Sequence, residues 1–307
     1  MTSTGPQQIT AVLDEVHAEA WRRVSEQLGR IELRGAHRRF LITRMGHTGS
    51  TWLAKLLNSH PDVLCLHEHV ISRAFPRRSF DSDDIVELIQ WLAGDTMHGA
   101  YLAAGDVGSG WTTHTVVLGG KFASAVLMRH PARVLNTRLR VYPVDNSYSE
   151  VPVTSRLTIR RLWDIDIEAV SPVDRIFLHD LLTFASQVRL LGAVDLVLRI
   201  EDLQEPEYCG QVLEQLTTVR YPPDVIEDAI RHRVNVGPVP QMTVGEILGR
   251  FSPAQRTWYR TILQEIAPVL GYDPDDDRPL GSVNRTRTIG SVPMGDLPQV
   301  LGTTRCG

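Results

Sequence analysis

"RRFLITRMGHTGSTWLAKLL", residues 38–57, joins a short apolar segment to a helix-like apolar run through a turn that contains two glycines. The segment "RRFLITR" (38–44) is typical of a buried strand, and residues 51–59 have helical periodicity. In a strand-loop-helix unit, the loop N–H groups and the start of the helix converge on one point and carry partial positive charge. A phosphate-like anion is therefore the expected occupant of this turn.

The residues of the turn suit such a site, although a short glycine pattern is also compatible with an ordinary loop. Gly46 and Gly49 allow the backbone to curl tightly. The hydroxyl groups of Thr48, Ser50 and Thr51 can add hydrogen-bond donors. A nucleotide kinase loop ends in Gly-Lys-Ser/Thr, whereas this loop has Gly-Ser-Thr, so the lysine that would hold the β- and γ-phosphates is missing.

The rest of the chain alternates between strand-like and helix-like segments. Further short apolar runs lie at 62–66, 124–129 and 194–200. Helical patterns lie at 10–28, 83–92, 132–140, 173–191, 206–217 and 252–270. Near-continuous apolar strands that alternate with helices predict an α/β fold, a three-layer sandwich in which helices flank a central, mostly parallel sheet.

The segments divide the 307 residues into one large domain with two extensions. We expect an N-terminal helical extension at 1–37, an α/β domain at 38–274 and a weakly structured tail at 275–307. Proline and serine punctuate residues 142–155, which makes this stretch the best candidate for a loop or lid.

Composition limits the partners and the compartment. A formal charge of −4 gives no overall basic field for nucleic acid or an anionic membrane, so any anion site must be local. No stretch of about 18 apolar residues suggests a membrane span. Cys65, Cys209 and Cys306 have no motif spacing, which argues against a disulfide framework or a metal site. With no signal-peptide pattern at the N-terminus, we expect a cytoplasmic protein.

Four segments together resemble the sulfotransferases that use 3′-phosphoadenosine-5′-phosphosulfate (PAPS). "GHTGSTWLAKLLNSHPDV" (46–63) is similar to the 5′-phosphosulfate loop of that family, and "VLMRHPARVLNTRLR" (126–140) is similar to its 3′-phosphate segment. Weaker matches are "VLRIEDL" (197–203), in which Ile200 replaces a frequent aromatic residue, and "IAPVLGYDP" (266–274). The pattern is closest to bacterial members and to protein-tyrosine sulfotransferases. The resemblance implies a P-loop-like fold.

The resemblance also implies which residues would bind the PAPS donor and its product, 3′-phosphoadenosine-5′-phosphate (PAP). They are Gly46, His47, Thr48, Gly49, Ser50, Thr51, Trp52, Arg129 and Thr137. Independently of the family, an arginine that leaves a strand and a hydroxyl two turns into the next helix can both face a terminal phosphate. Trp52 stands where cytosolic sulfotransferases stack a tryptophan on adenine, but a tryptophan at this place can equally belong to the core.

His47 departs from the family pattern, which has lysine or arginine at this position. Sulfuryl transfer, like phosphoryl transfer, passes through a loose transition state and depends on donors placed where charge develops. With an ordinary pKa near 6.5, His47 would be only partly charged at neutral pH. We hypothesise that the anionic donor raises the pKa of His47 so that it stabilises the leaving phosphate.

Two residues compete for the role of the base that deprotonates the acceptor. Glu68, in "HPDVLCLHEHV", occupies the place of the glutamate base of protein-tyrosine sulfotransferases and is the first choice. His114, in "WTTHTV", resembles the histidine of the Lys-Thr-His motif of cytosolic sulfotransferases.

These observations predict an enzyme that transfers a sulfuryl group from PAPS to a hydroxyl of a small molecule, a natural product or a carbohydrate. The alternatives are an atypical P-loop kinase that uses ATP and Mg²⁺, and a non-catalytic nucleotide-binding protein. The sequence does not specify the acceptor or the oligomeric state.

Overall fold

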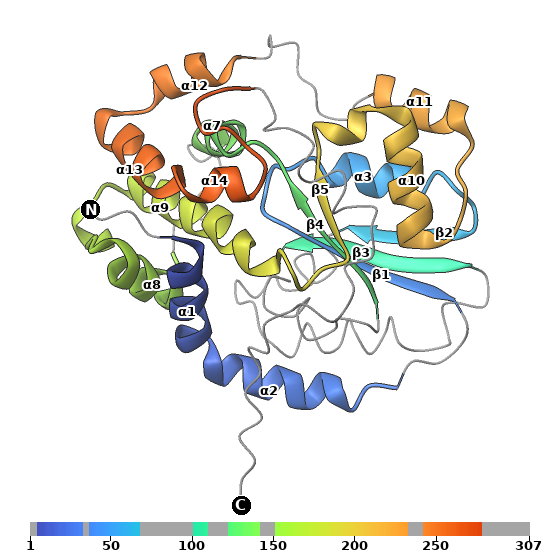
Figure 1. Ribbon diagram of the computed structural model, residues 1–307, viewed down its shortest axis with the longest axis horizontal. Helices are drawn as coiled ribbons and strands as arrows, with labels where there is room; N and C mark the ends of the chain where they lie inside the picture. The colour runs from blue at the N-terminus through green and yellow to red at the C-terminus, as the bar shows by residue number, and fades with distance from the viewer. Residues whose placement is uncertain are drawn as a thin grey trace, which may run out of the picture.

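The centre of the molecule is a parallel β-sheet. The computed structural model describes residues 5–32, 37–67, 101–109, 122–141, 151–232 and 242–277. Within them, five strands lie in the order β2-β3-β1-β4-β5, and every pair is parallel (Figure 1). The strands are β1 (Arg38–Arg44), β2 (Val63–His67), β3 (Ala103–Ser109), β4 (Ala123–Met128) and β5 (Leu196–Arg199).

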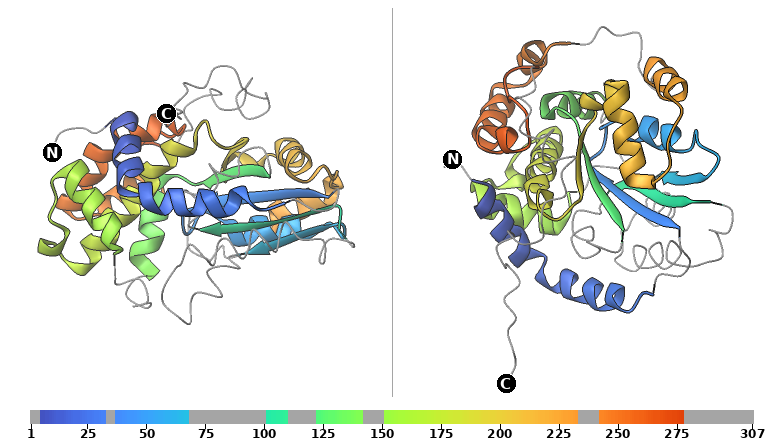
Figure 2. Two further views of the ribbon diagram at one scale, coloured as in Figure 1. Left: turned by 90° about the horizontal axis from the view of Figure 1, so that it is seen from below. Right: turned by 45° about the vertical axis from the view of Figure 1, so that its right-hand side comes forward.

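Helices cover both faces of this sheet, which makes three layers (Figures 1 and 2). One face carries α3 (Ser50–Leu57), α10 (Pro206–Thr217) and α11 (Pro223–Arg231). The other carries α1 (Pro6–Val16), α7 (Pro131–Val141), α8 (Val153–Trp163), α9 (Pro172–Ala185), α12 (Val244–Arg250), α13 (Pro253–Leu263) and α14 (Ile266–Val269). The remaining described helices are α2 (Ala18–Gly29) and the short 3-10 turns η3 (Ile167–Ala169), η4 (Ser186–Leu190) and η5 (Asp202–Gln204).

Strand β4 shows why the strands are apolar throughout. Val126 and Met128 belong to the core cluster on the side of α7 and α9. Ala125 and Leu127 belong to the cluster on the side of α3 and α10. Because successive side chains of a strand point to opposite faces, a sheet buried on both sides needs apolar residues at every position. The predicted three-layer α/β fold is confirmed.

Strand β3 is a central element that the sequence analysis did not predict. Its sequence, "AAGDVGS", contains mostly small residues and one buried aspartate, Asp106. Those residue types are depleted in strands, so propensity gives no signal. Small size is nevertheless what the position requires, because a Cβ atom on Gly105 would lie 2.2 Å from the carbonyl oxygen of Phe40 in β1.

Several predicted helices have different bounds in the structure. The pattern at 10–28 forms two helices, because α1 ends at Val16 and α2 begins at Ala18. The pattern at 252–270 is likewise split into α13 and α14, and the one at 173–191 into α9 and η4. Helix α8 begins at Val153, inside the segment predicted as a loop at 142–155, and α11 and α12 were not predicted. The helix predicted at 83–92 lies outside the described residues.

The N-terminal segment packs against the α/β domain. Ile9 and Leu13 of α1 are buried in the core cluster that contains α8 and α9. At the other end, the short segment after Tyr272 is held by hydrogen bonds as far as Asp277. No helix among the described residues is long and apolar enough to cross a membrane.

The strand order places a topological switch point between the carboxyl ends of β1 and β4. From β1 the chain runs through α3 to β2 on one side, while β4 leads to β5 on the other side. In open parallel sheets, ligands bind where the connections diverge in this way. The glycine turn follows β1 and Arg129 follows β4, so the two predicted phosphate-binding segments meet at this point.

Candidate functional site

The turn after β1 is held by its own side chains. The hydroxyl of Thr48 is fully buried and donates to the carbonyl oxygen of Met45 at 3.0 Å. The guanidinium of Arg44 donates to the same carbonyl at 3.2 Å. The predicted role of Thr48 as a hydroxyl donor to the ligand therefore competes with a structural role inside the turn.

Two residues of the turn have positive φ angles. Gly49 has φ 92° and directly precedes the first residue of α3. A Cβ atom at Gly49 would lie 2.9 Å from Cδ1 of Ile200, so the end of β5 packs against the turn where glycine is needed. His47 has φ 64°, which is uncommon for a residue other than glycine and indicates that the surrounding turn fixes its backbone.

The hydroxyls at the start of α3 have different surroundings. The Ser50 hydroxyl is buried and lies 3.0 Å from Nε2 of His67, the last residue of β2. Thr51 is half-buried. Trp52 is buried in the core cluster, and its indole N–H donates to the carbonyl of Ala229 in α11 at 2.7 Å. These contacts give Trp52 a packing role, and its adenine contact stays a prediction.

Arg129 lies against the turn, as the predicted site requires. Its guanidinium donates to the backbone carbonyl of His47 at 3.2 Å, which links two segments 82 residues apart in sequence. Thr137 is half-buried on α7, and its hydroxyl donates to the carbonyl of Arg133 at 2.9 Å. While this bond persists, the single proton of the hydroxyl is used and cannot be donated to a phosphate. The hydroxyl oxygen can still accept a hydrogen bond.

Three guanidinium groups act on His47. The pKa of His47 is lowered to about 4, first by burial and then by the charges of Arg138, Arg44 and Arg129. These arginines come from α7, the end of β1 and the residue after β4. His47 is therefore neutral at pH 7, and the positive charge beside the turn comes from arginines. The raised pKa that we hypothesise for His47 requires a bound anion that outweighs these charges.

The sequence analysis did not include Arg44, Arg138 or Asp180 in the site. Arg138 forms an ion pair with Asp180 of α9 at 3.2 Å, and both side chains are largely buried. Burial raises the pKa of Asp180 to about 6 against the opposing effect of Arg138. The carboxylate that orients Arg138 therefore comes from α9 and not from the glycine turn. Arg138 could have been included from the sequence, because it directly follows Thr137. Its ion-pair partner Asp180 could not, because Asp180 lies on a different helix.

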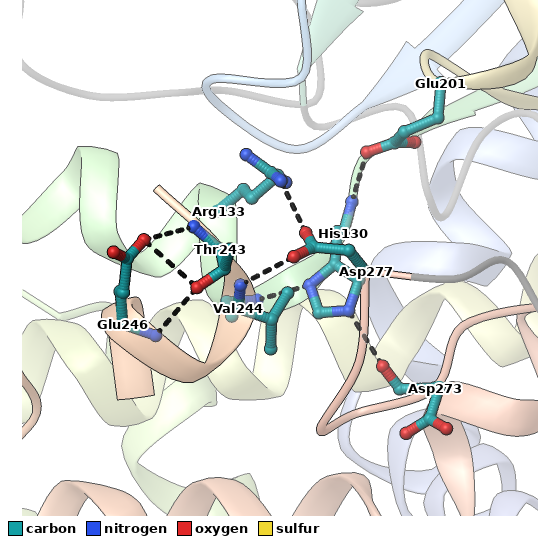
Figure 3. Close-up of polar contacts among 9 residues, drawn as sticks. His130, Arg133, Glu201, Thr243, Val244, Glu246, Asp273 and Asp277 are labelled. Carbon is teal, nitrogen blue, oxygen red and sulfur yellow. Dashed lines mark hydrogen bonds and ion pairs between the residues drawn. The ribbon is translucent and has the colours of Figure 1, made fainter. Parts of the chain in front are cut away.

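The residue after Arg129 is held by a buried network (Figure 3). The backbone N–H of His130 donates to Glu201 at 3.0 Å, and the hydroxyl of Tyr272 donates to the same carboxylate at 3.1 Å. The ring of His130 accepts from the N–H of Ala132 through Nδ1, so its Nε2–H donates to the carbonyl of Asp273 at 2.8 Å. The segment that resembles the family's Glu-Asp-Leu strand end thus fixes the backbone beside Arg129.

Asp277 extends this network to α12. Its carboxylate pairs with Arg133 and also accepts from the backbone N–H of Val244 at 2.9 Å. Thr243 and Glu246 complete a capping box at the same helix start. The C-terminal part of the domain is therefore attached through Arg133 to the first turn of α7, the helix that also carries Thr137.

The two predicted bases cannot be placed. Glu68 and His114 both lie outside the described residues. Residues 71–100 and 142–150 also lie outside the described residues. Cys65 and Cys209 are buried and free, and the described part of the chain contains no group of three or more His, Cys, Asp or Glu residues arranged to hold a metal ion.

Neutral His47 makes the folded chain sensitive to acid. Its pKa is about 4 in the folded chain against 6.5 when exposed, so the unfolded state takes up the proton first as pH falls. The contribution of neutral His47 to the free energy of unfolding is full above pH 6.5 and is lost as pH falls from 6.5 towards 4. After allowance for partial exposure, we expect this loss to be roughly 1–2 kcal/mol.

Urea unfolding at pH 7 and pH 4.5 would measure this effect. His47→Gln should lose less stability between the two pH values than the unchanged chain, because glutamine does not titrate. The raised pKa of Asp180 has the opposite effect, because Asp180 adds stability as pH falls through 6. Both proteins contain Asp180, so its effect cancels in the comparison. An equal loss in both proteins would show that His47 is not held neutral.

Comparisons with known proteins give a distant structural likeness. No family model matches the chain, and no curated protein matches it. Among solved structures, the chain is similar to the mouse sulfotransferase SULT7A1 complexed with PAP, with a TM-score of 0.47 and 13% sequence identity. That similarity covers 85% of this chain and 92% of the mouse chain. A likeness of this size says nothing about the activity, which is inferred from the residues of the site.

Proposed function

We propose that this protein is a sulfotransferase that transfers a sulfuryl group from PAPS to a hydroxyl acceptor. The observation that carries the proposal is the convergence of Arg44, Arg129 and Arg138 on the backbone turn at His47. In a chain of net charge −4, such a local concentration of guanidinium groups at a helix start is suited to a ligand with several negative charges.

The arrangement favours a donor with phosphates at two positions. The turn and the start of α3 would bind the 5′-phosphosulfate through backbone N–H groups and the hydroxyls of Ser50 and Thr51. Arg129 and the start of α7 would bind a second phosphate, which in PAPS is the 3′-phosphate. Because the guanidinium of Arg129 contacts the turn directly, it would lie near both the 5′-phosphosulfate and the 3′-phosphate of the ligand.

The chain's own residues would then act on the reaction as follows. The fixed charges of Arg44, Arg129 and Arg138 stabilise negative charge on the 5′-phosphate as the bond between sulfur and the bridging oxygen breaks. His47 donates a hydrogen bond to that oxygen, as a neutral ring or as an imidazolium. Glu68, or else His114, accepts the proton of the acceptor hydroxyl while its oxygen bonds to sulfur. The last two roles rest on the family resemblance.

Two alternatives remain distinct from this proposal. A P-loop kinase would need a lysine where the turn has Ser50, and the hydroxyl of Ser50 is instead in contact with His67. A non-catalytic nucleotide-binding protein would keep the arginines without turnover. For the acceptor we propose a hydroxyl of a small molecule, a natural product or a carbohydrate. The cysteine usage favours a reducing compartment such as the cytoplasm.

Calorimetric titration tests the donor class. We expect PAP to bind with micromolar affinity, and adenosine-5′-phosphate to bind at least tenfold more weakly because it lacks the 3′-phosphate. ATP with and without Mg²⁺ is titrated beside them. A preference for ATP with Mg²⁺, or indifference to the 3′-phosphate, would replace the sulfotransferase proposal with the kinase.

Substitutions at His47 test its part in turnover. His47→Ala should lower kcat by about a hundredfold and change PAP affinity much less, because a donor to the leaving oxygen acts mainly in the transition state. His47→Lys should retain activity and should remove any loss of activity that accompanies deprotonation of His47 as pH rises, because lysine keeps its charge there. An alanine variant with unchanged kcat on an acceptor that the unchanged chain sulfates would remove His47 from the reaction.

A further inference from the structure

Ser50, one of the residues predicted to bind the donor, contacts His67, which has not been assigned any role in the site. Ser50 is 5% exposed and is the first residue of α3, at the positive end of the helix. His67 ends β2, the outermost strand on this side of the sheet. Their side chains meet at 3.0 Å, between Oγ of Ser50 and Nε2 of His67.

The direction of this hydrogen bond depends on what else Ser50 contacts. A serine hydroxyl has one proton, so Ser50 either donates it to Nε2 or accepts a proton from Nε2–H. An ionised phosphate or sulfate group only accepts hydrogen bonds. When such an anion accepts from Ser50, the hydroxyl oxygen can only accept from His67, so Nε2 must carry the proton.

We infer that His67 is a positioning residue that makes the hydroxyl of Ser50 donate to an anion bound in the turn. This inference rests on the proposed function, because it assumes an anionic ligand at the start of α3. His67 acts through Ser50 and is not assigned any contact with the reacting atoms. Its ring selects the Nε2–H form on binding, either by a change of tautomer or by uptake of a proton from solvent.

The charges around His67 set the form that it has before the ligand binds. Burial and the positive charge of Arg44 lower the pKa of His67, so the ring is neutral at pH 7. The other ionisable groups on the packed elements are Lys55 on α3, which is exposed, and Asp106 on β3, which is buried. Glu68, the next residue, lies outside the described part of the chain.

A bound anion changes this balance. Negative charge beside Ser50 opposes the effect of Arg44 and favours a protonated His67. Binding then takes up protons in the pH range just below neutrality, and affinity for the anion rises as pH falls through that range. Because a bound anion would raise the pKa of any histidine this close to it, the dependence of the effect on Ser50 is what identifies a positioning role.

The test is calorimetric titration of the full chain with PAP, and with inorganic pyrophosphate as a smaller probe. His67→Leu removes the proton donor and should weaken PAP binding about tenfold, the expected effect of losing a hydrogen bond that supports a charged acceptor. His67→Gln keeps an N–H at the same distance from the backbone and does not titrate. It should bind within about twofold of the unchanged chain at pH 7, by the same reasoning.

The dependence on Ser50 and on pH separates positioning from packing. In a Ser50→Ala background, His67→Leu should cause no further loss, because the hydroxyl that it positions is gone. Between pH 8 and pH 6, the affinity of the unchanged chain should rise more than that of His67→Gln. Both proteins retain His47, so the difference in the pH dependence of their affinities is caused by His67. In the ¹⁵N spectrum of labelled histidine, Nε2 of His67 should be protonated when PAP is bound.

The outcomes distinguish this inference from the proposed function. If the unchanged chain binds neither PAP nor pyrophosphate, the proposed function fails, and the role of His67 fails with it. If the chain binds PAP while His67→Leu binds equally well, or loses as much affinity without Ser50 as with it, only the role of His67 is overturned. Should His67→Leu not fold, the comparison with His67→Gln and the ¹⁵N spectrum of the unchanged chain still decide.

Discussion

Arg129→Ala is expected to abolish measurable binding of PAP, with a loss of affinity of at least about a hundredfold. Two effects combine in this loss. The variant removes a fork of charged donors from the 3′-phosphate, and it removes the hydrogen bond that joins the guanidinium to the carbonyl of His47. Because that bond supports the turn, the variant weakens both ends of the ligand site.

Calorimetry with two nucleotides separates these effects. If Arg129 binds the 3′-phosphate, the loss is larger for PAP than for adenosine-5′-phosphate, and Arg129→Lys restores part of it by returning the charge without the fork. If the loss is equal for both nucleotides, Arg129 acts through the turn alone. Arg140→Ala is the control, because Arg140 is an exposed arginine on α7, the helix that follows Arg129. Binding of PAP within threefold of the unchanged chain would overturn the proposed site.

Gly105→Ala should have the largest effect on stability, a loss of roughly 3 kcal/mol or more in the free energy of unfolding. The added methyl group would lie 2.2 Å from the carbonyl oxygen of Phe40 and 2.4 Å from its ring. A backbone atom in the middle of β1 cannot move away without breaking the pairing of β1 with β3. The strain therefore falls on the two strands that support the turn.

Urea unfolding checks this expectation. Gly245→Ala is the control, since a Cβ atom at Gly245 has no neighbour within 4 Å and alanine favours the helix that contains it. That control should be neutral or slightly stabilising. An alanine variant at Gly105 with unchanged stability would mean that β3 does not lie against β1 as the structure shows.

Part of the fold followed directly from the sequence. The strand, turn and helix at 38–57 and the apolar strands at 62–66, 124–129 and 194–200 lie within about two residues of their observed positions. These elements were predictable because burial on both faces imposes a continuous apolar pattern. Strand β3 was not, because its place against Phe40 demands small residues, and small residues give no strand signal.

For the candidate site, the sequence determined which residue types follow β1 and β4, because glycines, hydroxyls and an arginine next to buried strands are a local pattern. Only the tertiary structure brought Arg138 to His47, paired Arg138 with Asp180, and set Ser50 against His67. These contacts join residues that are far apart in the chain. Their charges and hydrogen bonds depend on distances that strand order and helix packing fix, and no local pattern of residues encodes those distances.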